Sequence, residues 1–171
     1  MMRLVHTAAA ASIATMLVLA SVALASTSAK QAAMTKSLIA IKERGSGVMS
    51  ADKTFKGHFV LALMGLTKDS GRTAIHPNQG ATTIIDGQQR TAVFGEDVLT
   101  SNKGTLEISF HGVDVTINNV DPRKAPSDVE SGVWRIIGGT GIYKGWTGRG
   151  LWANAGTSTV NSIEWDGYVT H

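Results

Sequence analysis

The chain has 171 residues, of which 43% are hydrophobic and 17% are charged, and its formal net charge is +3. This length fits one domain of about 100–200 residues, and the apolar content excludes an intrinsically disordered chain. The small, scattered positive charge indicates no nucleic-acid surface, and the absence of cysteine excludes disulfides, thiolate metal sites and cysteine nucleophiles.

The first 25 residues have the three parts of an export signal. Arg3 supplies the positive start, the stretch 4–24 is almost uncharged, and Ala23-Leu24-Ala25 provides a small-residue cleavage site. We therefore expect cleavage after Ala25, export to the periplasm or the cell exterior, and no stable membrane insertion of the mature protein. The alternative is an uncleaved membrane anchor, because the apolar run approaches the roughly 20 residues that span a bilayer.

Residues 26–36 are small and polar without periodicity, so we interpret them as a flexible lead-in to one domain over 37–171. Apolar and polar residues then alternate. In Phe55–Leu63 the odd-numbered positions are apolar or glycine, whereas Lys56 and His58 occupy the other face. This period of two is typical of a β-strand with one buried face.

The same alternation continues along the chain. It recurs in Leu106–Phe110, after which His111-Gly112 predicts a turn into a new strand at 113–117, and His76–Asn78 has the character of a loop. The other predicted strands are Ala81–Ile85, Arg90–Leu99, Gly132–Ile137, Arg149–Ala153 and Asn161–Thr170. Many short strands without a helical apolar stripe predict an all-β closed antiparallel barrel or a sandwich, with few helices.

The densest glycine run lies late in the chain and contains Gly138, Gly139, Thr140, Gly141 and Gly145. It does not match a nucleotide-binding loop, because the glycine after Gly141 comes four positions later, at Gly145, and no helical period follows. Glycine accepts positive φ and close backbone approach, so the run predicts a sharp turn between two strands. Tyr143 and Trp146 are then expected to cover that end of the sheet.

This run carries a resemblance that covers Gly132–Gly150 most strongly. Its pattern Gly-Gly-Thr-Gly-x-aromatic-x-Gly-x-x-Gly resembles the allene oxide cyclase-like and dirigent-like barrel superfamily, and in particular bacterial secreted members. The resemblance implies a single antiparallel eight-stranded barrel with an apolar interior, assembled as a homodimer or homotrimer. It implies no activity, because the shared glycines are structural and one fold supports unrelated functions.

Three charged residues within predicted strands are candidate catalytic groups. Glu107, Arg135 and Glu164 lie on the face opposite an apolar set or beside a tryptophan. If that face lines a cavity, a carboxyl group with a raised pKa would serve as a general acid or base. We favour the alternative of a solvated outer face, because charged groups are rarely buried without partners.

Aromatic residues are the candidates for ligand contact. They are Trp134, Tyr143, Trp146 and Trp152, and Trp165 belongs to the same tryptophan-rich last third. Such rings line pocket mouths and subunit interfaces, and they equally fill ordinary cores. The histidines have no metal-ligand spacing, so we expect neither a metal nor a cofactor.

The sequence leaves three functions open. The first is a small-molecule-binding barrel that takes an apolar ligand in its interior. The second is a cyclase-type or dirigent-type enzyme that guides an unstable intermediate mainly by positioning, which leaves little trace in a sequence. The third is an extracellular structural or interaction protein whose outer face forms an oligomer.

Overall fold

A computed structural model describes residues 36–46, 49–117, 127–157 and 160–171. The expected signal segment 1–25, and the lead-in 26–36 apart from Lys36, lie outside these residues. The strands are β1 (Lys36–Ser46), β2 (Phe55–Leu63), β3 (Leu66–Ile85), β4 (Gln88–Ser101), β5 (Gly104–Thr116), β6 (Asp128–Gly139), β7 (Thr147–Gly156) and β8 (Val160–Thr170). A single 3-10 turn, η1 (Gly141–Tyr143), joins β6 to β7.

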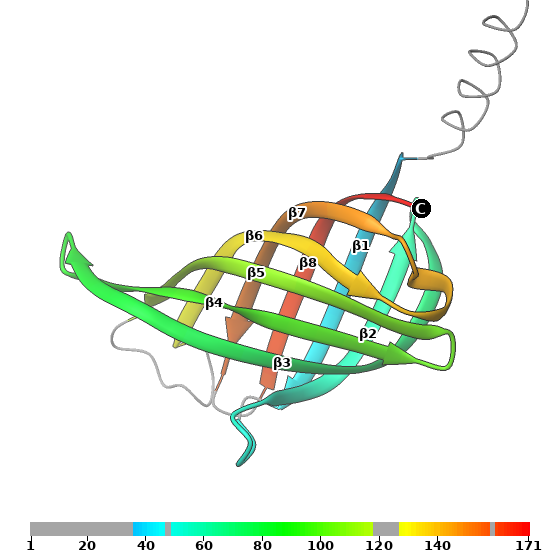
Figure 1. The fold of residues 1–171 in the computed structure, drawn as a ribbon. Helices are drawn as coiled ribbons and strands as arrows, with labels where there is room; N and C mark the ends of the chain where they lie inside the picture. The colour runs from blue at the N-terminus through cyan, green and yellow to red at the C-terminus, as the bar shows by residue number, and fades with distance from the viewer. Residues whose placement is uncertain (1–35, 47–48, 118–126, 158–159) are drawn as a thin grey trace, which may run out of the picture. The chain divides into compact units, whose positions relative to one another are not determined.

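The eight strands form one antiparallel sheet that closes on itself. Each strand pairs with the next along the chain, and β8 pairs with β1, which makes a closed barrel (Figure 1). The prediction of an all-β, antiparallel, eight-stranded fold is thereby confirmed. Within the described ranges, no helix is long and apolar enough to cross a membrane.

The alternating strand directions give the barrel two different ends. The β2–β3 and β4–β5 hairpins, η1 and the C-terminal residue His171 lie at one end, which we call the η1 end. The β3–β4 hairpin and the last residues of β5 and β7 lie at the other, which we call the cavity end after the hollow described below. The two ends differ in the polar groups that they hold.

Apolar side chains fill the middle of the barrel, as the period-two alternation predicts. The core includes Ile41, Leu61, Leu99, Leu106 and Ile108, all fully buried. The large ring of Phe110 fits because Gly95 lies opposite it on the neighbouring strand β4. A Cβ atom on Gly95 would lie 2.9 Å from the Phe110 ring and 2.3 Å from the carbonyl oxygen of His76, so only glycine fits there.

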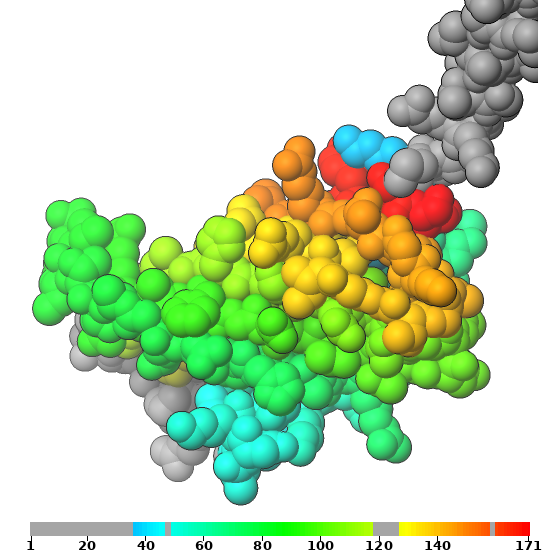
Figure 2. Space-filling view, viewed as in Figure 1, coloured from blue at the N-terminus to red at the C-terminus, as the bar shows by residue number. Residues whose placement is uncertain are grey.

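The expected loop at His76–Asn78 is part of β3, which corrects the sequence interpretation. The last residue pair between β2 and β3 is Phe55 with Ile75, and beyond it β3 pairs only with β4, with Pro77 opposite Gly95. A proline has no backbone N–H to donate. It fits here because β3 has a neighbouring strand on only one side at this point. The long β3–β4 hairpin projects from the body of the barrel in Figure 2.

The expected turn at His111-Gly112 is also absent, because β5 runs through it without a break. Phe110 faces the interior and is buried, whereas Val113 is 42% exposed on the outer face. The apolar residues therefore change face along one continuous strand. The reason is that the interior itself becomes polar toward the cavity end, where Asp114 occupies the inward parity.

The glycine run performs the turn that its sequence predicts, though not at every position. Gly141 and Gly145 have positive φ angles of 58° and 83°. Gly138 and Gly139 belong to β6 and are not among the residues with positive φ. Gly139 instead meets the close-approach expectation, because a Cβ atom there would lie 2.6 Å from the carbonyl oxygen of Tyr143.

Candidate functional site: a cavity at one end of the barrel

A cavity of about 100 Å³ lies inside the barrel at its cavity end. Phe55, Phe110, Trp152 and Trp165 form its aromatic wall. The Phe110 ring meets Trp152 edge to face, with centroids 5.3 Å apart, and lies 5.7 Å from the Trp165 ring in the same manner. Such edge-to-face pairs hold the rings in fixed positions and leave a rigid apolar surface.

Polar side chains line the rest of the cavity. Asp128, Glu130, Asn154 and Asn161 all face it, from β6, β7 and β8. The strand register places Glu130 opposite Asn154 on one side and opposite Asp114 on the other. These side chains therefore form a continuous polar row on adjacent strands, next to the aromatic wall.

The hydrogen bonds in this row leave several acceptor oxygens without a partner. Asn154 donates from Nδ2 to Glu130 Oε2 over 3.0 Å, which orients its Oδ1 atom away from that carboxylate. Asn154 is only 9% exposed, yet Oδ1 has no hydrogen-bond partner among the described residues. The Oδ1 atoms of Asn161 and Asp114 are buried and unpartnered in the same way.

The carboxyl groups of the row resist ionisation. Burial raises the pKa of Glu130, the hydrogen bond from Asn154 offsets part of this, and the nearby charges of Asp114 and Asp128 raise it further. Burial is also the main cause that raises the pKa of Asp114 and of Asp128. No ion pair joins any of the three to a basic side chain in the described parts of the chain.

A second group of buried carboxyls lies beside the cavity. Thr73 Oγ1 is 2.7 Å from Glu43 Oε2 and 2.5 Å from Asp97 Oδ1. A hydroxyl has one proton and can donate to only one of them, so a carboxyl proton must complete the chain of hydrogen bonds. Burial and the charge of Asp97 raise the pKa of Glu43 well above its usual value, and burial raises that of Asp97.

This carboxyl pair is adjacent to the cavity. Glu43 and Thr73 line a small hollow that shares Phe55, Ile75 and Ile163 with the cavity wall. The pair therefore holds at least one proton in the barrel interior, separated from the cavity by these apolar side chains. A carboxyl pair of this kind can accept and return a proton close to a bound molecule.

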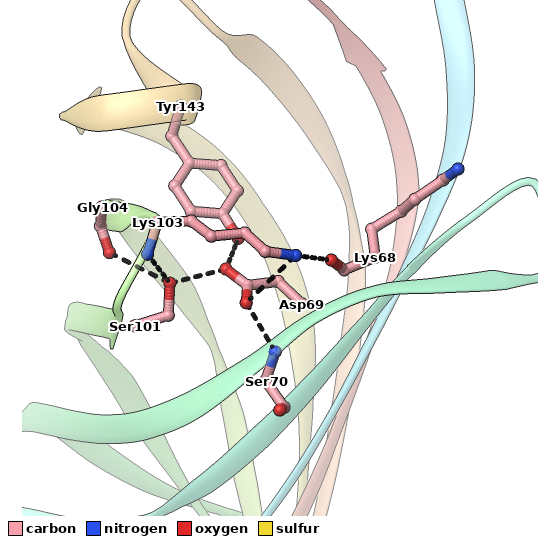
Figure 3. A network of polar contacts seen from close by, with 7 residues as sticks. All are labelled: Lys68, Asp69, Ser70, Ser101, Lys103, Gly104 and Tyr143. Atoms are coloured by element: carbon pink, nitrogen blue, oxygen red, sulfur yellow. Dashed lines mark hydrogen bonds and ion pairs between the residues drawn. The ribbon is translucent and has the colours of Figure 1, made fainter.

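The η1 end holds a different polar network, drawn in Figure 3. Asp69 is 6% exposed and accepts hydrogen bonds from the Tyr143 hydroxyl at 2.5 Å, the Ser101 hydroxyl at 2.6 Å and the Ser70 amide at 2.9 Å. Lys103 Nζ lies 3.8 Å from its second oxygen. Burial alone would raise the pKa of Asp69, but these donors together outweigh it and lower the pKa. Both oxygens are thus engaged, so the network anchors η1.

The four aromatic residues that the sequence suggested for ligand contact lie in different parts of the barrel. Trp152 lines the cavity, together with Trp165. Trp134 is buried in the core and donates its indole N–H toward the carbonyl oxygens of Leu151 and Asp166, at 3.0 and 3.2 Å. Tyr143 and Trp146 pack together at the η1 end, with ring centroids 5.0 Å apart, and they cover that end as expected.

The three charged candidates lie on the outer face and do not meet in a cavity. Glu164 forms an exposed ion pair with Lys42 at 3.0 Å, and Arg135 donates to the Ser109 hydroxyl at 3.3 Å. Glu107 occupies the same outward parity of β5, between the buried Leu106 and Ile108. The solvated-face alternative therefore describes all three, and the requirement that they converge in one cavity is not met.

The polar residues at the cavity share one signal that the sequence contains. Glu43 has the parity of Ile39 and Ile41, and Asn154 has the parity of Trp152, so each polar residue interrupts an apolar face. A search for polar residues within apolar faces, in place of charges opposite them, would have found both. No such search could have shown that both lie in register with Ile163, on either side of strand β8.

Comparisons with protein families, curated proteins and solved structures return no match for this chain. The chemistry of the site must therefore be argued from its own residues. Over the described ranges, no group of three or more histidine, aspartate or glutamate side chains is arranged to hold a metal ion.

Proposed function

We propose that this chain is an exported protein that binds a small, mainly apolar molecule in the cavity at one end of its barrel. The aromatic wall of Phe55, Phe110, Trp152 and Trp165 is the observation that carries this proposal. A dry apolar cavity of about 150 Å³ is large enough for benzene. The cavity here is smaller, about 100 Å³, so it takes at most one ring-sized group, with the rest of a larger ligand outside the barrel.

The polar row supports the same proposal. A buried polar atom without a partner costs about 1–3 kcal/mol, so a merely structural interior would avoid the two unpartnered Oδ1 atoms of Asn154 and Asn161 that line the cavity. A ligand that supplies hydrogen-bond donors at this position recovers that free energy. Ligand pockets typically combine an apolar wall with a few polar groups of this kind.

The four tryptophans provide a direct test, because two line the cavity and two do not. We expect titration with benzyl alcohol to shift the indole N–H resonances of Trp152 and Trp165 in a two-dimensional proton–nitrogen NMR spectrum. The resonance of Trp146, at the η1 end, is the internal control and should not move. If benzyl alcohol at millimolar concentration moves neither cavity tryptophan, or moves all four equally, the proposal is wrong.

A second candidate function is favoured by the carboxyl pair Glu43 and Asp97. A cyclase-type or dirigent-type enzyme requires a proton donor or acceptor beside an apolar pocket, and this pair holds a proton next to one. The test is incubation of an organic extract of the exporting culture with the protein. Conversion of a component by the wild-type protein, and not by Glu43→Gln, would establish the enzyme.

We further propose that the fold is that of the allene oxide cyclase-like and dirigent-like barrels, after removal of a signal peptide. The closed order of eight antiparallel strands and the glycine turn at η1 support it. Native mass spectrometry of the exported protein tests the cleavage of the signal peptide and the oligomeric state. We expect the mass of a dimer or a trimer of a chain that begins at Ser26.

A further inference from the structure

We infer that the ligand of this cavity carries an ammonium group next to its apolar ring. The inference rests on the proposed function and names the chemical class of the bound molecule. It depends on one contrast at the cavity. Acceptor oxygens gather in the polar row, and no lysine or arginine among the described residues forms an ion pair with them. An organic cation is the chemical complement of such a row.

The hydrogen-bond pattern disfavours an anionic ligand. Of the buried unpartnered atoms that line the cavity, two are the amide oxygens of Asn154 and Asn161, and one is a donor, Trp165 Nε1. Asn154 uses Nδ2 in its bond to Glu130, which leaves a carbonyl oxygen as its free group. Asn161 also presents an unpartnered carbonyl oxygen. The pKa values of Asp128 and Glu130 are raised, and a cation bound beside these two carboxyl groups would favour their ionised form, which only accepts hydrogen bonds. A carboxylate or phosphate ligand would meet acceptors and negative charge, so it would be repelled.

The Asn154 amide is the feature that separates this site from an ordinary acidic patch. Its side chain is 9% exposed, lines the cavity and holds an oxygen that no described residue contacts. An ammonium group has three donors that point in different directions. Placed between Glu130, Asn154 and Asn161, it would satisfy oxygens from three adjacent strands at once.

The aromatic wall favours a cation as well. The face of an indole or phenyl ring carries negative potential, so an ammonium group within about 6 Å of the ring centre is attracted. Trp152 lies one inward position along β7 from Asn154, and Trp165 lies opposite Trp152 on β8. A ring-sized group against these indoles thus leaves its ammonium substituent at the polar row.

A metal ion fits this site less well than an organic cation. Of the oxygens in the row, Asn161 and Asn154 supply neutral amides, and no three carboxylate or histidine groups converge on one point in the described chain. Hard metal ions take six or more oxygen ligands at short distance. An ammonium group needs only three acceptors and gains from the aromatic wall.

Three probes of equal size separate the head groups: benzylammonium, benzyl alcohol and benzoate. Their dissociation constants at neutral pH follow from the indole shifts of Trp152 and Trp165. We expect benzylammonium to bind about tenfold or more tightly than benzyl alcohol, and benzoate not to bind. If benzyl alcohol binds as tightly as benzylammonium, the ammonium inference is wrong and the proposed function stands. If no probe moves these two resonances, both are wrong.

Two matched variants locate the preference. Glu130→Gln keeps the shape of the side chain and removes its charge. We expect it to weaken the binding of benzylammonium at least about fivefold and to weaken the binding of benzyl alcohol less. Glu164→Gln removes an exposed carboxylate from the outer face and should leave the preference unchanged. Asp128→Asn serves as a second cavity variant if Glu130→Gln fails to fold. An unchanged preference in a folded cavity variant would overturn the assignment.

Discussion

Buried carboxyl groups at the two ends of the barrel differ in their partners. At the η1 end, Asp69 accepts hydrogen bonds from two hydroxyls and an amide and lies near Lys103, and its pKa is lowered. At the cavity end, Glu130 receives one amide hydrogen bond and has carboxyls as neighbours, and its pKa is raised. The same closed sheet thus holds a hydrogen-bonded network that fixes a turn at one end and a row in which several acceptor oxygens lack a donor at the other. Partner count, more than burial, separates the two roles.

The largest expected effect comes from disruption of the η1 end at Gly141. Its φ of 58° costs a side chain about 1–2 kcal/mol, and a Cβ atom would lie 2.0 Å from the carbonyl oxygen of Lys103. We therefore expect Gly141→Val to lower the melting temperature by several degrees or more and to reduce the exported yield. Thermal melts followed by circular dichroism measure the first effect.

Gly145 provides the matched control for that clash. Its φ of 83° is equally unfavourable for a side chain, but no heavy atom lies within 4 Å of a Cβ atom built there. Gly145→Val should therefore show the backbone cost alone, and its melting temperature should fall less than that of Gly141→Val. Equal losses in the two variants would contradict the steric part of the argument.

The next effect concerns the hydrogen bond between Tyr143 and Asp69. Tyr143→Phe removes one donor from a buried carboxylate, and we expect it to lower the free energy of unfolding by about 1–3 kcal/mol. Tyr168→Phe is the control, because Tyr168 is 50% exposed on the outer face, and it should change the value by less than about 0.5 kcal/mol. Urea unfolding measures the free energy of unfolding of both variants. If Tyr143→Phe lowers it no more than Tyr168→Phe does, the network does not anchor η1.

The strands were predictable because most of the interior is apolar. Where hydrophobic side chains alternate along a whole strand, as in Phe55–Leu63, the period of two identifies both the strand and its buried face. The turn at Gly141 was predictable for a related reason, since a dense glycine run has few structural uses. These features depend on neighbours close in sequence.

The site was not predictable because it violates the alternation that revealed the strands. Asp114 faces inward while Val113 faces outward, so β5 was divided at Gly112 into two strands. The candidate acids were sought opposite the apolar face, where Glu107 lies on the outer side of β5 and is partly exposed. Side-chain contacts between strands that are not direct neighbours, such as Glu43 on β1 with Thr73 on β3, join residues 30 positions apart, and the alternation along one strand cannot reveal them.

The smallest effect concerns the pH dependence contributed by Glu130. Because its pKa is raised in the folded protein, the folded state keeps the proton at pH values where the unfolded state has lost it. Stability from this group is therefore present below the ordinary glutamate pKa of about 4.3 and is lost as pH rises through the raised value. Glu130→Gln removes this loss, so the free energy of unfolding of the variant should rise relative to wild type as the pH increases from about 4.3 toward neutrality. Glu164→Gln, which removes an exposed carboxylate, shows how much of that change any lost surface charge produces. Urea unfolding across this pH range measures the difference, which should be smaller than the effect of Tyr143→Phe. A relative stability that falls with pH would mean that the Glu130 carboxylate is already paired in the folded protein, like that of Asp69, and that the contrast between the two ends does not hold.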